Sequence, residues 1–103
     1  MVAKITIPES AIASFCQRWG IRELALFGSA LREDFSRESD IDLLATFKPG
    51  REPRLADLLV MESELATIFG RRVDLGEREV VEQDPNYLRR KAILNSAQVI
   101  YAE

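Results

Sequence analysis

Apolar residues recur along the first part of the chain at the spacing of a helix and then of a strand. Intervals of three and four residues predict a helix over residues 8–20, and Gly20 supplies its end. The apolar stripe of this helix consists of Ile12, Phe15, Cys16 and Trp19. Residues 21–27 are a short apolar run that stops at a glycine, which predicts a buried strand. A short helix is expected over residues 29–35.

A second strand and a long helix follow in the middle of the chain. Residues 40–47 predict a strand with two different faces. One face carries Ile41, Leu43, Ala45 and Phe47, and the other carries Asp40, Asp42, Leu44 and Thr46. Residues 54–69 predict the clearest helix, which Gly70 ends. Its apolar stripe is expected to contain Leu55, Leu58, Leu59, Leu65, Ile68 and Phe69.

Short elements complete the predicted fold. Residues 72–75 are expected to form a third strand that breaks at Gly76. Asp84 and Pro85 have the character of a cap and first residue of a helix that reaches about Ala97, and residues 99–101 can add a last strand. This order of elements predicts the α/β (α+β) class, with a small mixed β-sheet packed by helices in a single domain over residues 1–103.

The composition excludes several classes of function. A net charge of −3, from 14 basic and 17 acidic residues, gives no global attraction to nucleic acid or to anionic membranes. Direct binding of nucleic acid or of a membrane is therefore not expected. No apolar run approaches the roughly 20 residues that span a bilayer, and the N-terminus lacks the apolar segment of a signal peptide. The single cysteine, Cys16, excludes a disulfide within the chain and is compatible with a cytoplasmic location.

Two aspartates stand one residue apart in the predicted strand over residues 40–47. Asp40 and Asp42 should share one face of the strand, roughly 6–7 Å from each other. Two like charges at that range, among apolar neighbours, repel each other and resist desolvation. The chain contains no histidine, so a metal between these carboxylates should be a hard cation with oxygen ligands, such as Mg²⁺. The alternative is a strand end with two solvated carboxylates.

A Gly-Ser pair follows the first predicted strand and opens the expected helical turn. Gly28 lets a phosphate approach the backbone, and the hydroxyl of Ser29 adds a hydrogen-bond donor. Arg32, one turn further on, could reach the same phosphate. An ordinary turn with a serine cap is the alternative. The pair gains weight from its place, because only ten residues separate it from the two aspartates.

The whole stretch "FGSALREDFSRESDIDLL" resembles the signature of the nucleotidyltransferase superfamily typified by DNA polymerase beta. The residues that match are Phe27, Gly28, Ser29, Asp40, Ile41, Asp42 and Leu43. The segments "SDIDLLATF", "GRRVDL" and "NYLRRKAILNSAQVIY" resemble the minimal nucleotidyltransferases that act as antitoxins beside HEPN ribonuclease toxins. One departure is Glu33, where many members of that family carry glycine, and it puts an acidic charge beside Arg32.

The resemblance implies a third carboxylate on a neighbouring strand, and Asp74 in "RRVDLG" is the candidate. Asp74 stands alone between Val73 and Leu75, an unfavourable place for a charge without a cation nearby. The alternative is an aspartate at a strand edge that pairs with Arg71 or Arg72. The implied catalytic and metal-binding residues are Asp40, Asp42 and Asp74, and the implied nucleotide-binding residues are Gly28, Ser29 and Arg32.

The resemblance implies an Mg²⁺-dependent protein adenylyltransferase with a cognate HEPN toxin as its partner. Such an enzyme transfers AMP from ATP to a tyrosine hydroxyl of the toxin and thereby neutralises it. Fewer than thirty residues follow Asp74, so we expect the partner to complete the acceptor side in a hetero-oligomeric complex. Two alternatives stay open: a nucleotidyltransferase that acts on a small-molecule alcohol such as an aminoglycoside, and a non-catalytic module that binds its toxin.

Overall fold

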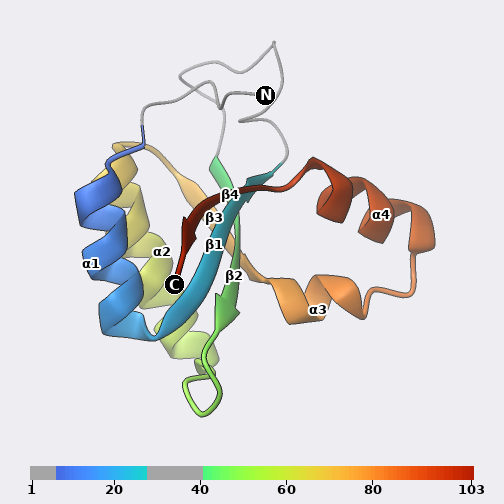
Figure 1. Ribbon diagram of the computed structural model, residues 1–103, viewed down its shortest axis with the longest axis horizontal. Coiled ribbons are helices and arrows are strands. Elements are labelled where there is room, and N and C mark those ends of the chain that lie inside the picture. The colour runs from blue at the N-terminus through green and yellow to red at the C-terminus, as the bar shows by residue number, and fades with distance from the viewer. Residues whose placement is uncertain (1–6, 28–40) are drawn as a thin grey trace.

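The computed structural model describes residues 7–27 and 41–103 and shows helices packed on a four-stranded sheet (Figure 1). In chain order the elements are α1 (Glu9–Trp19), β1 (Ile21–Phe27), β2 (Ile41–Phe47), α2 (Leu55–Phe69), β3 (Val73–Glu77), α3 (Arg78–Glu82), α4 (Tyr87–Ser96) and β4 (Gln98–Ala102). The predicted strand over residues 21–27 and the last strand are confirmed. The short helix expected over residues 29–35 lies outside the described residues.

The sheet is mixed, as the order of elements predicted. Its strand order is β3-β2-β1-β4, so β3 and β4 are its edges. β1 runs antiparallel to both β2 and β4, whereas β2 and β3 are parallel. A parallel pair needs a connection that returns the chain to the same end of the sheet, and α2 forms this connection between β2 and β3.

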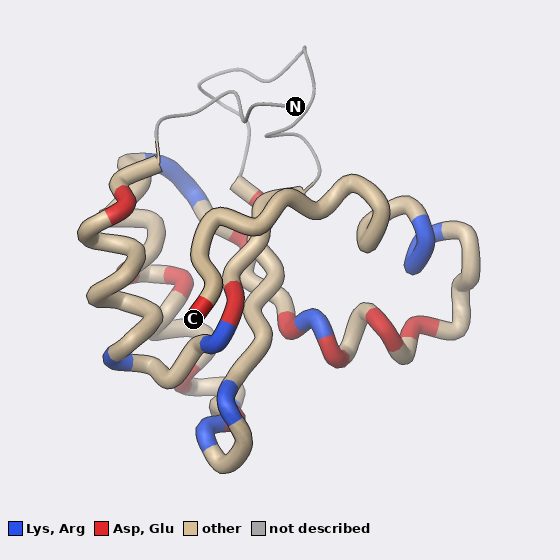
Figure 2. The backbone as a smooth tube through the Cα atoms, viewed as in Figure 1, with Lys and Arg blue, Asp and Glu red and all other residues tan. Residues whose placement is uncertain are grey.

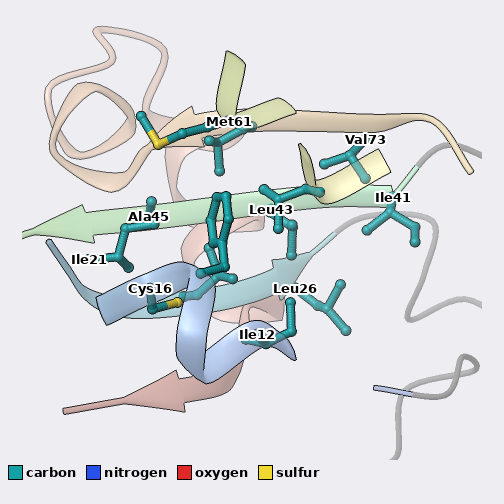
Figure 3. Packing of buried hydrophobic residues seen from close by; sticks show 13 residues of the cluster. Ile12, Cys16, Ile21, Leu26, Ile41, Leu43, Ala45, Met61 and Val73 are labelled. Carbon is teal, nitrogen blue, oxygen red and sulfur yellow. The ribbon is translucent and has the colours of Figure 1, made fainter. Parts of the chain in front are cut away.

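The hydrophobic core lies between one face of the sheet and the helices α1 and α2 (Figures 1 and 3). The buried cluster consists of Ile12, Phe15, Cys16, Ile21, Leu24, Leu26, Ile41, Leu43, Ala45, Met61, Leu65, Val73 and Leu75. The predicted alternation of β2 is therefore confirmed for Ile41, Leu43 and Ala45. Burial raises the pKa of the Cys16 thiol to about 12, which suits a residue of the core.

The end of α1 depends on a glycine for two reasons. Gly20 has φ 72°, a left-handed conformation that side chains other than glycine rarely adopt. A β-carbon at this position would also lie 2.8 Å from the side chain of Arg51. Just before it, Trp19 packs against the core and donates its indole N–H to Glu64 at 3.1 Å.

The apolar stripe of α2 is narrower than the sequence pattern predicted. Leu55 and Leu59 belong to the expected stripe, yet they are 74% and 61% exposed. The helix contacts the sheet mainly through Met61 and Leu65, with Leu58 beside them. Successive residues differ by about 100° around a helix, so Leu59 turns away from the sheet that Leu58 contacts. This part of the prediction is wrong because a leucine in a helix need not face the core.

Two expectations for the C-terminal part are also wrong. β3 does not break at Gly76 but continues through it, because Gly76 pairs with Leu44 across the parallel ladder. α4 begins at Tyr87 rather than at Pro85, and its cap is Asn86, whose side-chain oxygen accepts the Arg89 N–H at 3.1 Å. The side chain of Tyr87, the first residue of α4, is exposed and does not belong to the core.

Asp84 and Tyr87 instead have other contacts at the start of α4. The carboxylate of Asp84 accepts hydrogen bonds from Asn86 N–H at 2.9 Å and from the guanidinium of Arg89 at 2.8 Å. These contacts, that from Arg89 above all, lower the pKa of Asp84. The Tyr87 ring is 57% exposed, and Arg90 and Lys91 lie over it at 5.4 and 5.9 Å from its centre.

The structure also bears on the sequence-based expectation that the chain does not enter a membrane. Within the described residues, no helix is both long enough and apolar enough to cross a bilayer.

Candidate active site

The pairing of two parallel strands brings two of the predicted carboxylates together. In the ladder between β2 and β3, Asp42 stands directly opposite Asp74. Neighbouring strands lie about 4.8 Å apart, and paired residues of a parallel ladder point to the same face. Asp42 is half-buried and Asp74 is exposed. Two residues that are 32 positions apart in the chain therefore form one pair of carboxylates.

The two carboxylates project from the face of the sheet that α1 and α2 do not cover. Their neighbours Ile41 and Leu43 on β2, and Val73 and Leu75 on β3, are all buried in the core. Since side chains alternate along a strand, Asp42 and Asp74 point to the opposite face. Figure 1 shows α3 and α4 on the other side of the sheet from α1 and α2. The carboxylates thus lie on the face of the sheet opposite the core, on the same side as α3 and α4.

The chemistry of this pair suits a hard divalent cation. Two carboxylates at the distance between neighbouring strands repel each other, and a cation between them removes this repulsion. All four side-chain oxygens are of the type that Mg²⁺ prefers. Within the described residues, no group of three or more acidic, cysteine or histidine side chains is placed to hold a metal ion. Two of the three predicted ligands, Asp42 and Asp74, thus stand opposite each other, and the third, Asp40, lies outside the described residues.

The strand that precedes the Gly-Ser pair ends beside the same carboxylates. Phe27, the last residue of β1, pairs with Asp42 across the antiparallel ladder. The end of β1 and the beginnings of β2 and β3 therefore meet at one corner of the sheet. Gly28, Ser29 and Arg32 follow this corner in the chain and lie outside the described residues, so their expected phosphate contacts stay predictions.

Two hydrogen bonds hold β3 in the position that places Asp74. At the start of the ladder, Ile41 N–H donates to the carbonyl of Arg72 at 2.9 Å. On the outer edge, Leu75 N–H donates to the Glu62 carboxylate at 2.8 Å. β3 is an edge strand, so this amide has a side chain from α2 as its partner.

The sequence analysis missed Glu62. The signal that could have found it is its place in α2, directly after buried Met61 and four residues after Leu58, which packs against the core. A carboxylate beside the buried stripe of a helix needs a polar partner within reach. That signal does not say which partner, because the partner belongs to a strand 13 residues further along the chain.

The comparison with protein families decides the class. A family model described as "Nucleotidyltransferase domain" matches residues 9–100, which is most of the chain. The chain belongs to the nucleotidyltransferase domain family. The family resemblance of the sequence is thereby confirmed, and so is the fold that it implied.

One curated relative of this nucleotidyltransferase domain is the protein adenylyltransferase MntA of Thermococcus cleftensis. It is 37% identical over 59 residues, which are 57% of this chain and 58% of the relative. The chain thus spans less than two thirds of the length of this relative.

Solved structures share the fold. A structure assigned to the minimal nucleotidyltransferases is 31% identical, with a TM-score of 0.66 over 87% of this chain and 86% of that one. A toxin-antitoxin crystal structure with AMP-PNP has a TM-score of 0.71 at 17% identity, over 94% of this chain and 75% of that one. A complex of a tri-AMPylated Shewanella oneidensis HEPN toxin with an MNT antitoxin has a TM-score of 0.59 at 14% identity, over 92% of this chain and 70% of that one.

Proposed function

We propose that this nucleotidyltransferase domain is an antitoxin that transfers AMP from ATP to a tyrosine hydroxyl of a cognate HEPN toxin. The observation that carries the proposal is the pair of Asp42 and Asp74 on adjacent strands, at the corner of the sheet where β1 ends. The names of the relatives support it: one is a protein adenylyltransferase, and one structural neighbour is a complex with an AMPylated HEPN toxin.

Each predicted residue has a task in this reaction. Asp40, Asp42 and Asp74 would hold Mg²⁺, and the ion when bound would neutralise negative charge on the triphosphate and on the departing pyrophosphate. Gly28 and Ser29 would bind the β- and γ-phosphates through a backbone N–H and a hydroxyl, with Arg32 as a further donor. The site would thus act by positioning and by charge neutralisation, which needs no histidine or cysteine.

The proposed transfer exchanges one phosphate ester bond for another. The tyrosine oxygen attacks the α-phosphorus, the bond from that phosphorus to the bridging oxygen breaks, and pyrophosphate leaves. Asp74 would orient the phenol and accept its proton. Because Asp74 is exposed, its carboxylate can pass that proton on to water. AMP stays on the toxin, which is the modification proposed to silence it.

Label transfer tests the proposal directly. The purified chain is incubated with Mg²⁺, the HEPN toxin encoded by the neighbouring gene, and ATP labelled at the α-phosphate or at the γ-phosphate. We expect label on the toxin from α-labelled ATP only, because pyrophosphate carries the γ-phosphate away. Mass spectrometry should place the AMP on a tyrosine.

Matched variants locate the chemistry. Asp42→Asn and Asp74→Asn should lower the rate of transfer by about a hundredfold or more, since each removes a charge from the site. Asp57→Asn is the control, because Asp57 lies on α2, on the side of the sheet opposite to the carboxylate pair. The amide oxygen of the asparagine can still accept the hydrogen bond from the Arg54 N–H. Absence of label with the wild-type chain, or transfer that survives Asp42→Asn, would refute the proposal. Label on an added aminoglycoside instead would favour the small-molecule alternative.

A further inference from the structure

A cleft of about 730 Å³ opens between the sheet and the helices α3 and α4. Its floor includes Glu23 of β1 and Thr46 of β2, and α3 contributes Arg78. Leu94 of α4 and Val99 of β4 form its apolar side. Figure 1 shows α3 and α4 projecting from the sheet as a separate arm, connected to it at both ends.

The helices beside this cleft are short of packing partners. Neither α3 nor α4 has a single buried side chain, although α4 is ten residues long. Isolated helices of this length are marginal in water, so a helix of a folded protein is normally stabilised by an apolar face that packs against something. Here Val80 is 63% exposed and Leu88 is 76% exposed. The arm is held to the sheet by Arg78, whose guanidinium lies 3.3 Å from the carboxylate of Glu23.

The cleft and the carboxylate pair share one face of the sheet. Thr46 and Asp42 are four residues apart on β2, so both side chains point away from the core. At about 3.3 Å per residue the cleft floor lies about 13 Å along the strand from Asp42. An extended polypeptide covers that length with about four residues. A bound polypeptide with one segment in the cleft could therefore place another of its own residues, about four positions away, at the carboxylates.

The charges of the cleft favour a polypeptide over a polyanion. The lining contains two cations, Arg22 and Arg78, and three anions, Glu23, Glu79 and Glu82, so its formal charge is 2 − 3 = −1. Arg78 pairs with Glu23 and Glu82. Along α3, Figure 2 shows one basic stretch with acidic stretches on either side. Such a lining repels the phosphates of RNA, whereas it can pair with a segment that carries both acidic and basic side chains.

We propose that this cleft binds a segment of the acceptor protein about four residues from the residue that receives AMP. The inference rests on the proposed function and extends it, because it assigns the recognition of the acceptor to a surface remote from the carboxylates. Apolar contacts with Leu94 and Val99 would anchor the segment, and the ionic groups of α3 would set its orientation.

Two leucines of α4 provide a matched pair of variants. Leu94 lines the cleft, while Leu88 is exposed and does not. In Leu94→Glu, a charge on the apolar side should raise the Kd for the HEPN toxin about tenfold or more, and should raise the KM for the toxin with the KM for ATP unchanged. Leu88→Glu should leave the Kd and both KM values at the wild-type level. Because α4 buries no side chain, both variants are expected to fold, which circular dichroism checks.

A second variant comes from a different element, so the test does not depend on α4. Thr46→Arg places a long cation on the cleft floor and should weaken toxin binding as Leu94→Glu does. The inference is overturned if both variants bind the toxin as the wild type does, or if Leu88→Glu weakens binding equally. It is also overturned if the wild-type chain self-associates in sedimentation and Leu94→Glu abolishes this, because a second copy would then be the occupant.

Binding and transfer separate this inference from the proposed function. If the wild-type chain binds the toxin without transferring AMP, and Leu94→Glu weakens that binding, the docking surface stands and the proposed reaction fails. If AMP is transferred and Leu94→Glu leaves the KM for the toxin unchanged, the proposed reaction stands and the docking surface fails.

Discussion

Replacing Glu62 with alanine should loosen the edge strand that carries Asp74. The Glu62 carboxylate accepts the Leu75 N–H at 2.8 Å, and Leu75 directly follows Asp74 in β3. β3 has a neighbouring strand on one side only, so the loss leaves this amide without a protein partner on the open side. Solvent can then compete for the strand edge, and Asp74 loses part of the support that keeps it opposite Asp42.

The structure sets the size of the effect. A hydrogen bond to a charged group contributes about 1.5–3 kcal/mol, and partial exposure of Glu62 lowers this to about 1–2 kcal/mol. With a factor of ten for about 1.4 kcal/mol, the Leu75 amide should exchange its hydrogen about five to thirty times faster in Glu62→Ala. Glu62→Gln keeps an acceptor oxygen without the charge and should show a smaller increase.

Hydrogen exchange measured by NMR checks this prediction. The Leu43 amide, in the central strand β2, reports on the stability of the whole sheet. We expect the Leu75 amide to respond more strongly than the Leu43 amide. Equal protection of Leu75 in the wild type and in Glu62→Ala would refute the reasoning, as would an equal change at both amides. If the site works as proposed, Glu62→Ala should also raise the Mg²⁺ concentration needed for half-maximal transfer of AMP. Glu62→Gln should raise that concentration less than Glu62→Ala does.

Two other outcomes follow from the packing and the ionic contacts. Leu65→Ala should lower the free energy of unfolding by about 2–5 kcal/mol, because Leu65 is fully buried. Leu59→Ala should lower it by less than about 0.5 kcal/mol, because Leu59 is exposed. Equal losses in urea unfolding would contradict the conclusion that α2 packs on the sheet through Leu65 and not through Leu59. The contacts of Asp84 lower its pKa below the unfolded value of 3.8. They therefore stabilise the start of α4 at any pH above 3.8, and this stabilisation is lost as the pH falls through the lower pKa of the folded state. The NMR shift of the Asn86 amide should therefore stay constant down to about pH 4, and an inflection at higher pH would contradict the contact.

Local patterns predicted the elements well where one residue type has one physical role. Gly20 and Gly70 end α1 and α2 with φ values of 72° and 73°, because glycine adopts the left-handed conformation at low cost. The prediction failed where several neighbouring residues could serve the same role. Asp84 and Asn86 are both good caps, and only the contact with Arg89 N–H decides for Asn86.

Which apolar side chains of α2 and α4 are exposed to solvent could not be predicted, for a related reason. A leucine or tyrosine at helical spacing indicates which residues share a face of the helix. It does not indicate whether that face meets the sheet, and the exposure of Leu59 and Tyr87 shows that it need not.

The sequence by itself determined the family, the mixed sheet and two carboxylates that are costly in strands without a cation. These follow from short-range spacing, because alternation along a strand and the signature around Asp42 extend over a few residues. Only the tertiary structure decided that Asp74 stands opposite Asp42, that Glu62 holds the edge of β3, and that α3 and α4 leave a cleft on the same face. The physical reason is that strand register is set by hydrogen bonds between segments far apart in the chain, and no local pattern records that pairing.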